Sequence, residues 1–269
     1  MHRYLPIGNI ALWSASAAAL CLFALPLLVL AGRGVGSRGW EGASVEAIQN
    51  AVLLSLFTTA ITLGLTLLFG TPLAYLLARR RFALRRALLI LLQMPIIMPP
   101  SVAGLALLIT FGRRGALGGI LSELGISLPF TTAAVIVAQT FVAAPFYIRA
   151  AMVGFQGVPR ELEAAARVDG ADSLTLFRRI TLPLALRGLG AGATLCWTRA
   201  LGEFGATILF AGSLSGRTQT MPLLIYGIFE RDLNAAIWVS LILAAIAFFS
   251  LLAASLLMRE ETNGTEMPL

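Results

Sequence analysis

Lysine is absent from this 269-residue sequence, and the chain has one histidine, His2, and two cysteines, Cys21 and Cys196. A Walker A loop requires a lysine that reaches the β- and γ-phosphates of ATP, so the chain cannot form one. ATP and Mg²⁺ would have to be bound by a partner protein. A His/Cys metal cluster cannot be assembled from so few ligands, so we expect no metal or other cofactor in this chain.

Charged residues are scarce as well. They make up 12% of the chain, hydrophobic residues make up 58%, and the mean hydropathy is +0.87. Soluble domains carry roughly 25% charged residues, and half that share cannot cover a surface that faces water. The composition therefore predicts a membrane protein. The net charge of +7 comes from arginines grouped in short loops, which favours membrane topology and lipid contact over nucleic-acid binding.

Six apolar runs are long enough to cross a bilayer, which takes about 20 residues. They predict an all-α, polytopic protein with one transmembrane domain over residues 1–269, and its spans lie at about 10–31, 51–78, 87–111, 131–153, 184–211 and 235–258. The first run has a basic flank like a signal peptide. Its core is too long for one and no good cleavage site follows it, so we expect a retained helix.

The arginines also predict an orientation. The second and fourth loops and the two termini together carry twelve arginines, and the opposite side carries six. Because positive charge accumulates in short cytoplasmic loops, both termini should face the cytoplasm.

Helix-breaking residues interrupt the third run. Pro99, Pro100 and Ser101 follow Pro95 closely, and the prolines lack the amide donors that a continuous helix needs. Irregular backbone at membrane depth is tolerated where it is buried in protein or lines a polar path. We interpret this cluster as a break in the translocation pathway; an ordinary proline kink is the alternative.

The loop over residues 154–183 is long and cytoplasmic in this topology. Pro159 can occupy the first turn of a short helix, where Glu161 and Glu163 suit the positive end of its dipole. Gly170 is well placed to end that helix in a left-handed conformation. These residues leave two interpretations open, a solvated connector and a slim helix that docks into another protein.

The same loop resembles the EAA loop of ABC importer permeases. Ala165, Ala166 and Gly170 match the motif, and so does the ending Ile180, Leu182 and Pro183, with both spacings kept. The glutamate of the motif falls on Ala164, and the acid stands at Glu163 instead. The resemblance implies a coupling helix that docks into a cleft of an ATPase subunit, and the residues expected to make this coupling are Glu161, Glu163, Ala165, Ala166, Asp169, Gly170 and Ala171.

Two further segments narrow the resemblance. Residues 98–104 with 111–115, and residues 199–208 with 211–212 and 216–222, are similar to permeases for molybdate, tungstate and sulfate. The likeness covers roughly residues 51–256. It implies a type I ABC importer permease in the cytoplasmic (inner) membrane of a prokaryote, working as a homodimer with two ATPase subunits and an extracytoplasmic oxyanion-binding protein. Molybdate or tungstate is the expected cargo, and sulfate or thiosulfate is the alternative.

An intramembrane charge pair marks a candidate gate. Arg199 and Glu203 lie four residues apart in the fifth run and can pair on one helix face. Each would cost about 2.5–3.5 kcal/mol at the membrane centre, so both should face the protein interior or a watery path. A structural clamp is the alternative to a gate. The expected gate residues are Arg199, Gly202, Glu203, Phe204, Gly205 and Thr207.

Two other classes of function fit less well. A secondary anion transporter would be expected to show a pair of corresponding broken helices, whereas the sequence indicates six spans with one prominent cytoplasmic loop and no such pair. A membrane-embedded enzyme would need a catalytic cluster, and a single Arg/Glu pair supplies too little. We therefore expect no bond chemistry from this chain.

Overall fold

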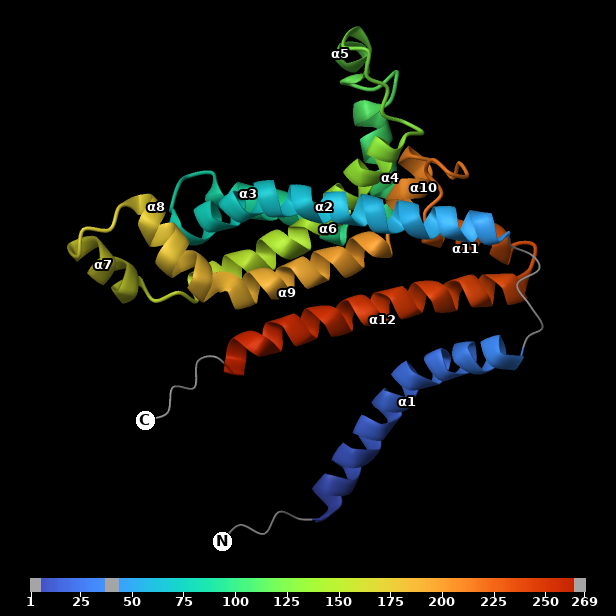
Figure 1. Ribbon diagram of the computed structural model, residues 1–269, viewed down its shortest axis with the longest axis horizontal. Coiled ribbons are helices and arrows are strands. Elements are labelled where there is room, and N and C mark those ends of the chain that lie inside the picture. The colour runs from blue at the N-terminus through green and yellow to red at the C-terminus, as the bar shows by residue number, and fades with distance from the viewer. Residues whose placement is uncertain (1–5, 37–43, 264–269) are drawn as a thin grey trace.

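The structure is a computed structural model that describes residues 6–36 and 44–263, and all the regular elements in that part of the chain are helices (Figure 1). The elements are α1 (Pro6–Gly36), α2 (Val45–Arg79), α3 (Arg85–Ile97), α4 (Pro100–Phe111), α5 (Gly118–Glu123), α6 (Thr132–Gln156), α7 (Arg160–Val168), α8 (Ser173–Leu176), the π-helical turn η1 (Phe177–Thr181), α9 (Leu182–Leu201), α10 (Gly205–Phe210), α11 (Met221–Phe229) and α12 (Leu233–Asn263). The predicted all-α class is confirmed.

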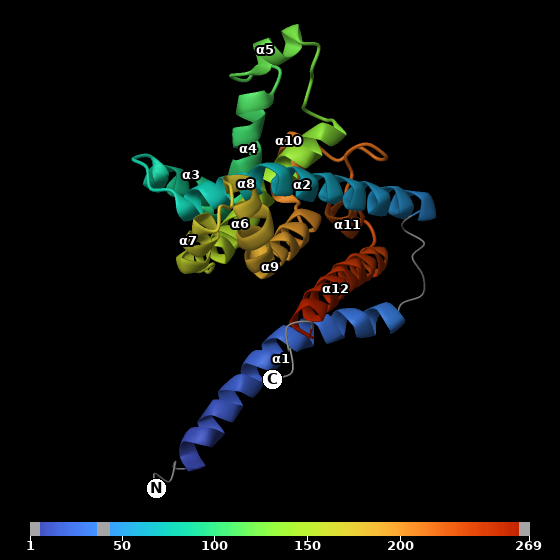
Figure 2. The same ribbon diagram turned by 60° about the vertical axis from the view of Figure 1, so that its left-hand side comes forward.

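The number of membrane spans depends on one bend. Within the described residues, five helical segments are long and apolar enough to cross a bilayer, and a sixth span results if α3 and α4 count as one. These two helices are bent by 115° at Met98–Pro99. The predicted six spans are therefore present only with a broken third span, and α4 leaves the bundle steeply with α5 at its far end (Figure 2).

Helix α6 forms the centre of the bundle and packs between α2 and α9. Small residues allow a close approach: a Cβ built on Gly188 of α9 would lie 2.5 Å from the Cα of Gly154 in α6. Helices in lipid associate through such close packing, because lipid tails are as apolar as the side chains and there is little hydrophobic driving force between helices. Around it, Tyr147 and Phe155 are completely buried. The three helices thus make a rigid core.

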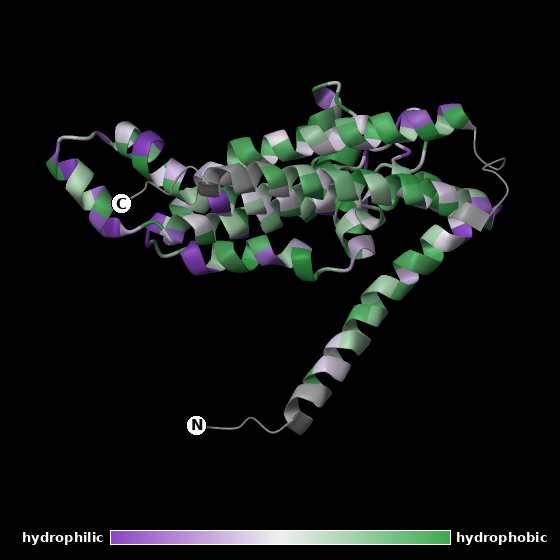
Figure 3. Ribbon diagram, turned by 60° about the horizontal axis from the view of Figure 1, so that its bottom comes forward, coloured by the Kyte–Doolittle hydropathy of each residue, from purple (hydrophilic) through white to green (hydrophobic). Residues whose placement is uncertain are grey.

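The outer helices complete a membrane-protein surface. Helix α1 packs against α12, and its first turns extend away from the rest of the bundle. Apolar residues cover most of the long helices, whereas the hydrophilic residues gather towards their ends and in the connections, including α7 (Figure 3). This distribution fits a chain whose helices face hydrocarbon.

The fifth predicted span, residues 184–211, is wrong as a single helix. Helix α9 ends at Leu201, Gly202 to Phe204 are not helical, and α10 begins at Gly205. The interruption was not predicted, because apolar residues predominate in both helices and form one long run in the sequence. Within the described residues the helical path is therefore interrupted twice, at Met98–Pro99 and between Leu201 and Gly205.

Candidate functional site

The first break lies where the sequence predicted it. Met98 ends α3 in an extended conformation, Pro99 precedes α4, and Pro100 occupies the first helical position. Proline suits that position because its missing N–H would have no helical partner there. Pro99, Pro100 and Ser101 are all exposed on the chain. The proline break is confirmed, whereas its role in a pathway remains a prediction.

The second break packs directly against the first. A Cβ built on Gly205 would lie 2.4 Å from the Cβ of Pro100, and one built on Gly104 would lie 2.8 Å from the carbonyl oxygen of Ala206. Both distances are shorter than real Cβ contacts. Glycine at these two positions is what allows α4 and α10 to touch, so the two broken segments form one junction.

The predicted pairing of Arg199 with Glu203 is confirmed. The guanidinium Nη1 of Arg199 lies 2.7 Å from Oε2 of Glu203, and the backbone N–H of Ala206 donates to Oε1 at 2.8 Å. The Glu203 side chain is 1% exposed and that of Arg199 is 30% exposed. One buried carboxylate therefore joins the last turn of α9 to the first turn of α10 across the break.

The remaining predicted gate residues surround this junction. Gly202 caps α9 and is exposed, and the ring of Phe204 packs against Tyr226 of α11 at 5.1 Å between centroids. Thr207 is completely buried, and its hydroxyl has no hydrogen-bond partner among the described residues. Thr207 is thus enclosed in protein in this conformation and does not line an open path.

Gln139, in the middle of α6, was not predicted as part of this site. Its side-chain amide donates to the carbonyl oxygen of Ala200 at 3.1 Å, and its Oε1 accepts from the hydroxyl of Thr62 at 3.2 Å. Gln139 is 1% exposed. It holds the end of α9 directly beside the break and ties it to α2. The available signal was a lone amide inside an apolar run, which is costly unless it is paired.

At the opposite part of the fold, the predicted coupling loop forms a helix, a glycine turn and a second helix. Pro159 precedes α7 as its cap rather than lying in its first turn. Gly170 has φ +87°, as expected for a left-handed helix end. Asp172 caps α8, and hydrogen bonds from Thr175 hold the pKa of that carboxyl below its usual range. The π-helical turn η1 that follows was not predicted.

The coupling residues do not all share one surface. Those that are exposed are Glu161, Ala165, Asp169 and Gly170, and those that are partly buried are Ala166 and Ala171. Glu163 is buried and turns towards the rest of the chain, where it pairs with Arg79; its expected part in ATPase coupling stays a prediction. Two apolar residues that were not predicted as part of this surface, Leu162 and Val168, are 48% and 88% exposed. Figure 1 shows α7 at the end of the bundle, beyond the long helices.

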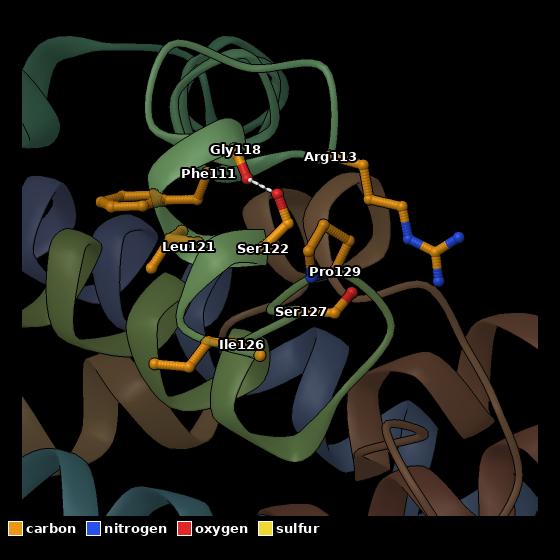
Figure 4. Close-up of a pocket in the computed structure, with 9 residues that line it drawn as sticks. Phe111, Arg113, Gly118, Leu121, Ser122, Ile126, Ser127 and Pro129 are labelled. Atoms are coloured by element: carbon orange, nitrogen blue, oxygen red, sulfur yellow. Dashed lines mark hydrogen bonds between the residues drawn. The ribbon is translucent and has the colours of Figure 1, made fainter.

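A cavity of about 370 Å³ lies at the α4–α5 hairpin, far from α7. Phe111 and Leu121 lie on one side of it, and the side chain of Arg113 extends on the other (Figure 4). The hydroxyl of Ser122 donates to the carbonyl oxygen of Gly118 at 2.8 Å. The Ser122 hydroxyl is thus engaged within the hairpin itself.

Known transport proteins share this architecture. A family described as binding-protein-dependent transport system inner membrane component matches residues 70–259. The molybdenum transport system permease protein ModB of Mycobacterium tuberculosis is 42% identical over 86% of this chain and 87% of its own length. ModB of Escherichia coli K12 is 37% identical over 78% and 93%, and the sulfate permease CysW of Synechococcus elongatus is 33% identical over 78% and 74%.

Solved structures show the same fold. A permease chain of a bacterial alginate importer superposes with a TM-score of 0.75 at 18% identity, over 94% of this chain and 95% of that one. A chain of the MetNI methionine transporter, in an inward-facing crystal form, gives 0.64 at 21% identity over 79% and 95%. With the match over residues 70–259, the chain belongs to the binding-protein-dependent transport system inner membrane components, the permease subunits of ABC importers.

Proposed function

We propose that this chain is the permease subunit of an ATP-driven importer that carries molybdate or tungstate across the inner membrane. Two relatives that cover most of the chain are named molybdenum permeases, at 42% and 37% identity, while a named sulfate permease stands at 33%. Molybdate, tungstate and sulfate are all tetrahedral dianions, so one pathway could accept them on charge and shape. The order of identity favours molybdate over sulfate.

The assembly contains two copies of the chain, two ATPase subunits and an extracytoplasmic binding protein. The observation that supports an external motor best is α7, a short helix that stands beyond the bundle with Leu162, Ala165 and Val168 exposed. Exposed apolar residues on a helix outside the membrane region suit a groove on a partner protein. ATP and Mg²⁺ are bound by that partner, and the chain itself breaks no bond.

The junction of the two breaks acts as the gate. Helix α4 contacts α10 through glycines, and the Arg199–Glu203 pair fixes α10 to α9. Packed elements of this kind have discrete arrangements rather than a continuous range, so a shift of α9 can separate Gly205 from Pro100. Movement of α7 by the ATPase supplies that shift, and the anion passes when the junction opens.

The test is uptake of radiolabelled molybdate into proteoliposomes that contain the purified complex. Uptake should require internal ATP and the loaded binding protein, and unlabelled tungstate should compete more strongly than sulfate. Uptake that persists without ATP and follows an ion gradient would instead identify a secondary transporter.

A further inference from the structure

Glu163 is a buried carboxylate on α7, a helix that lies beyond the ends of the long helices. Its Oε1 lies 2.9 Å from Nη2 of Arg79 and accepts a hydrogen bond of 2.8 Å from the hydroxyl of Thr181. Arg79 is the last residue of α2, and Thr181 is the last residue of η1, directly before α9. A single carboxylate therefore connects α7 with the ends of two long helices.

Arg79 strengthens the same connection. Its Nη2 also donates to the carbonyl oxygen of Val158 at 3.0 Å, immediately before the cap of α7. The side chains of Arg79 and Glu163 are 9% and 11% exposed. Arg79 thus binds both the residue that precedes the cap of α7 and a residue within the helix. Little water reaches the ion pair.

The charge around Glu163 makes its position specific. A polar cavity of about 410 Å³ beside α7 is lined by Arg79, Arg80, Arg160 and Arg167, and Glu163 is the one carboxylate among the described residues that line it. Removing that carboxylate would leave Arg79 buried without its counter-charge, which costs far more than loss of an exposed pair. The exposed Arg80, Arg160 and Arg167 can be screened by solvent instead.

The connection leads to the gate. Thr181 is completely buried, and α9 runs from Leu182 to Leu201, about 30 Å at the rise of an α-helix. Its far end carries Arg199, which pairs with Glu203 across the second break. A movement of α7 can therefore be transmitted to the gate through α9, as long as the contact between Glu163 and Thr181 is kept.

We propose that Arg79, Glu163 and Thr181 form a latch that makes α7 move as one body with α2 and α9. These are positioning residues: they transmit the movement of the ATPase and do not contact the cargo. The inference rests on the proposed function and adds the internal route by which the coupling helix drives the gate. It also gives a role to the displaced glutamate, which turns inward rather than towards the ATPase.

The main test uses Glu163→Gln and Arg79→Gln in the reconstituted complex, with Arg80→Gln as the control. Arg80 is adjacent, equally cationic and exposed, and among the described residues the ion pair of Glu163 is made with Arg79 and not with Arg80. Both latch variants should retain the ATPase subunit and basal hydrolysis within about twofold. They should lose at least fivefold of the stimulation by loaded binding protein and consume more ATP per molybdate imported. The double variant should be no worse than either single variant, since all three break one interaction.

Equal coupling in Glu163→Gln and Arg80→Gln would overturn the proposal, as would additive defects in the double variant. If the charge variants fail to assemble, Thr181→Val decides: it removes one hydrogen bond without burying a charge, and wild-type coupling in that variant would also overturn the latch.

A readout without transport separates failure of the latch from failure of the proposed function. Spin labels at Val168→Cys on α7 and Leu195→Cys on α9, both exposed positions, are introduced after Cys21→Ser removes the exposed native thiol. Their distance distribution should be narrow in the otherwise native chain and in Arg80→Gln, and broad in Glu163→Gln. A narrow distribution in Glu163→Gln would contradict the latch even if no import were detected.

Discussion

Gly205 lies directly against Pro100, so close that a Cβ on the glycine would stand 2.4 Å from the Cβ of the proline. The two residues belong to different broken segments, and these segments pack against each other at this point. Proline ends the helical ladder on one side, and glycine admits its ring on the other. The junction is therefore sensitive to single-atom changes.

Gly205→Leu should separate α4 from α10 and reduce molybdate uptake at least tenfold, because a Cβ at this position overlaps the Pro100 ring and its neighbouring backbone. The measurement is ATP-dependent uptake in proteoliposomes. Gly64→Ala is the control, since no described atom outside its own helix lies within 4 Å of a Cβ built there. Normal uptake by Gly205→Leu would remove the junction from the gate.

Glu203→Gln should lower the free energy of unfolding by about 1–3 kcal/mol. The neutral amide can still accept from Ala206 N–H, but it no longer balances Arg199. Loss of a buried partner costs 3–5 kcal/mol when the remaining charge is fully enclosed, and Arg199 is 30% exposed, which reduces the cost. Thermal unfolding in detergent measures the change.

Adding Arg199→Gln to Glu203→Gln should restore part of that loss, since the unpaired charge is then removed. A double variant that is as unstable as the sum of the two single variants would show that the pair does not interact in the way the geometry indicates.

Gln139→Leu should reduce the free energy of unfolding by about 1–3 kcal/mol and weaken the attachment of the end of α9 to α6. The substitution leaves the Thr62 hydroxyl without its side-chain partner and removes the amide that donates to the carbonyl oxygen of Ala200, both in a buried site. Thr140→Val on the same helix is the matched control, because that hydroxyl bonds only within its own helix, to Ile136. Equal stability of the two variants would contradict the role given to Gln139.

Ala165→Trp should abolish co-purification of the ATPase subunit while leaving the permease folded. Ala165 is exposed on α7, and an indole ring there would block the proposed entry of the helix into a groove of the ATPase. Leu124→Trp places the same ring on an exposed position after α5, far from α7, and should leave the complex intact. Recovery of the ATPase in equal yield from both variants would argue against docking through α7.

The parts of the structure that follow from short-range chemistry were predictable. Pro99 and Pro100 remove two neighbouring amide donors, which interrupts a helix whatever surrounds it. Gly170 ends α7 because the left-handed conformation is cheap for glycine, and the observed φ is +87°. Arg199 and Glu203 lie four residues apart along the chain, so their pairing could be expected even though the prediction of one continuous helix over residues 184–211 was wrong.

The missed features depend on partners far away in the sequence. Glu163 turns inward because the end of α2 presents Arg79, and no pattern within residues 154–183 contains that information. Gln139 is explained only by the carbonyl oxygen of Ala200, 61 residues later. The break at Gly202–Phe204 escaped notice because apolar residues continue on both sides, and the capping carboxylate of Glu203 is recognised as such only in three dimensions.

The most direct test of the whole account is where α7 lies and what it touches. A cysteine at Val168, which is 88% exposed, is introduced in the Cys21→Ser chain, whose other native cysteine, Cys196, is buried, and it is probed in intact cells and in inverted membrane vesicles. We expect an impermeant thiol reagent to label it only in inverted vesicles, and a short cross-linker to join it to the ATPase subunit with a yield that changes on ATP binding. Labelling from the outside of intact cells, with no cross-link to an ATPase, would contradict the account.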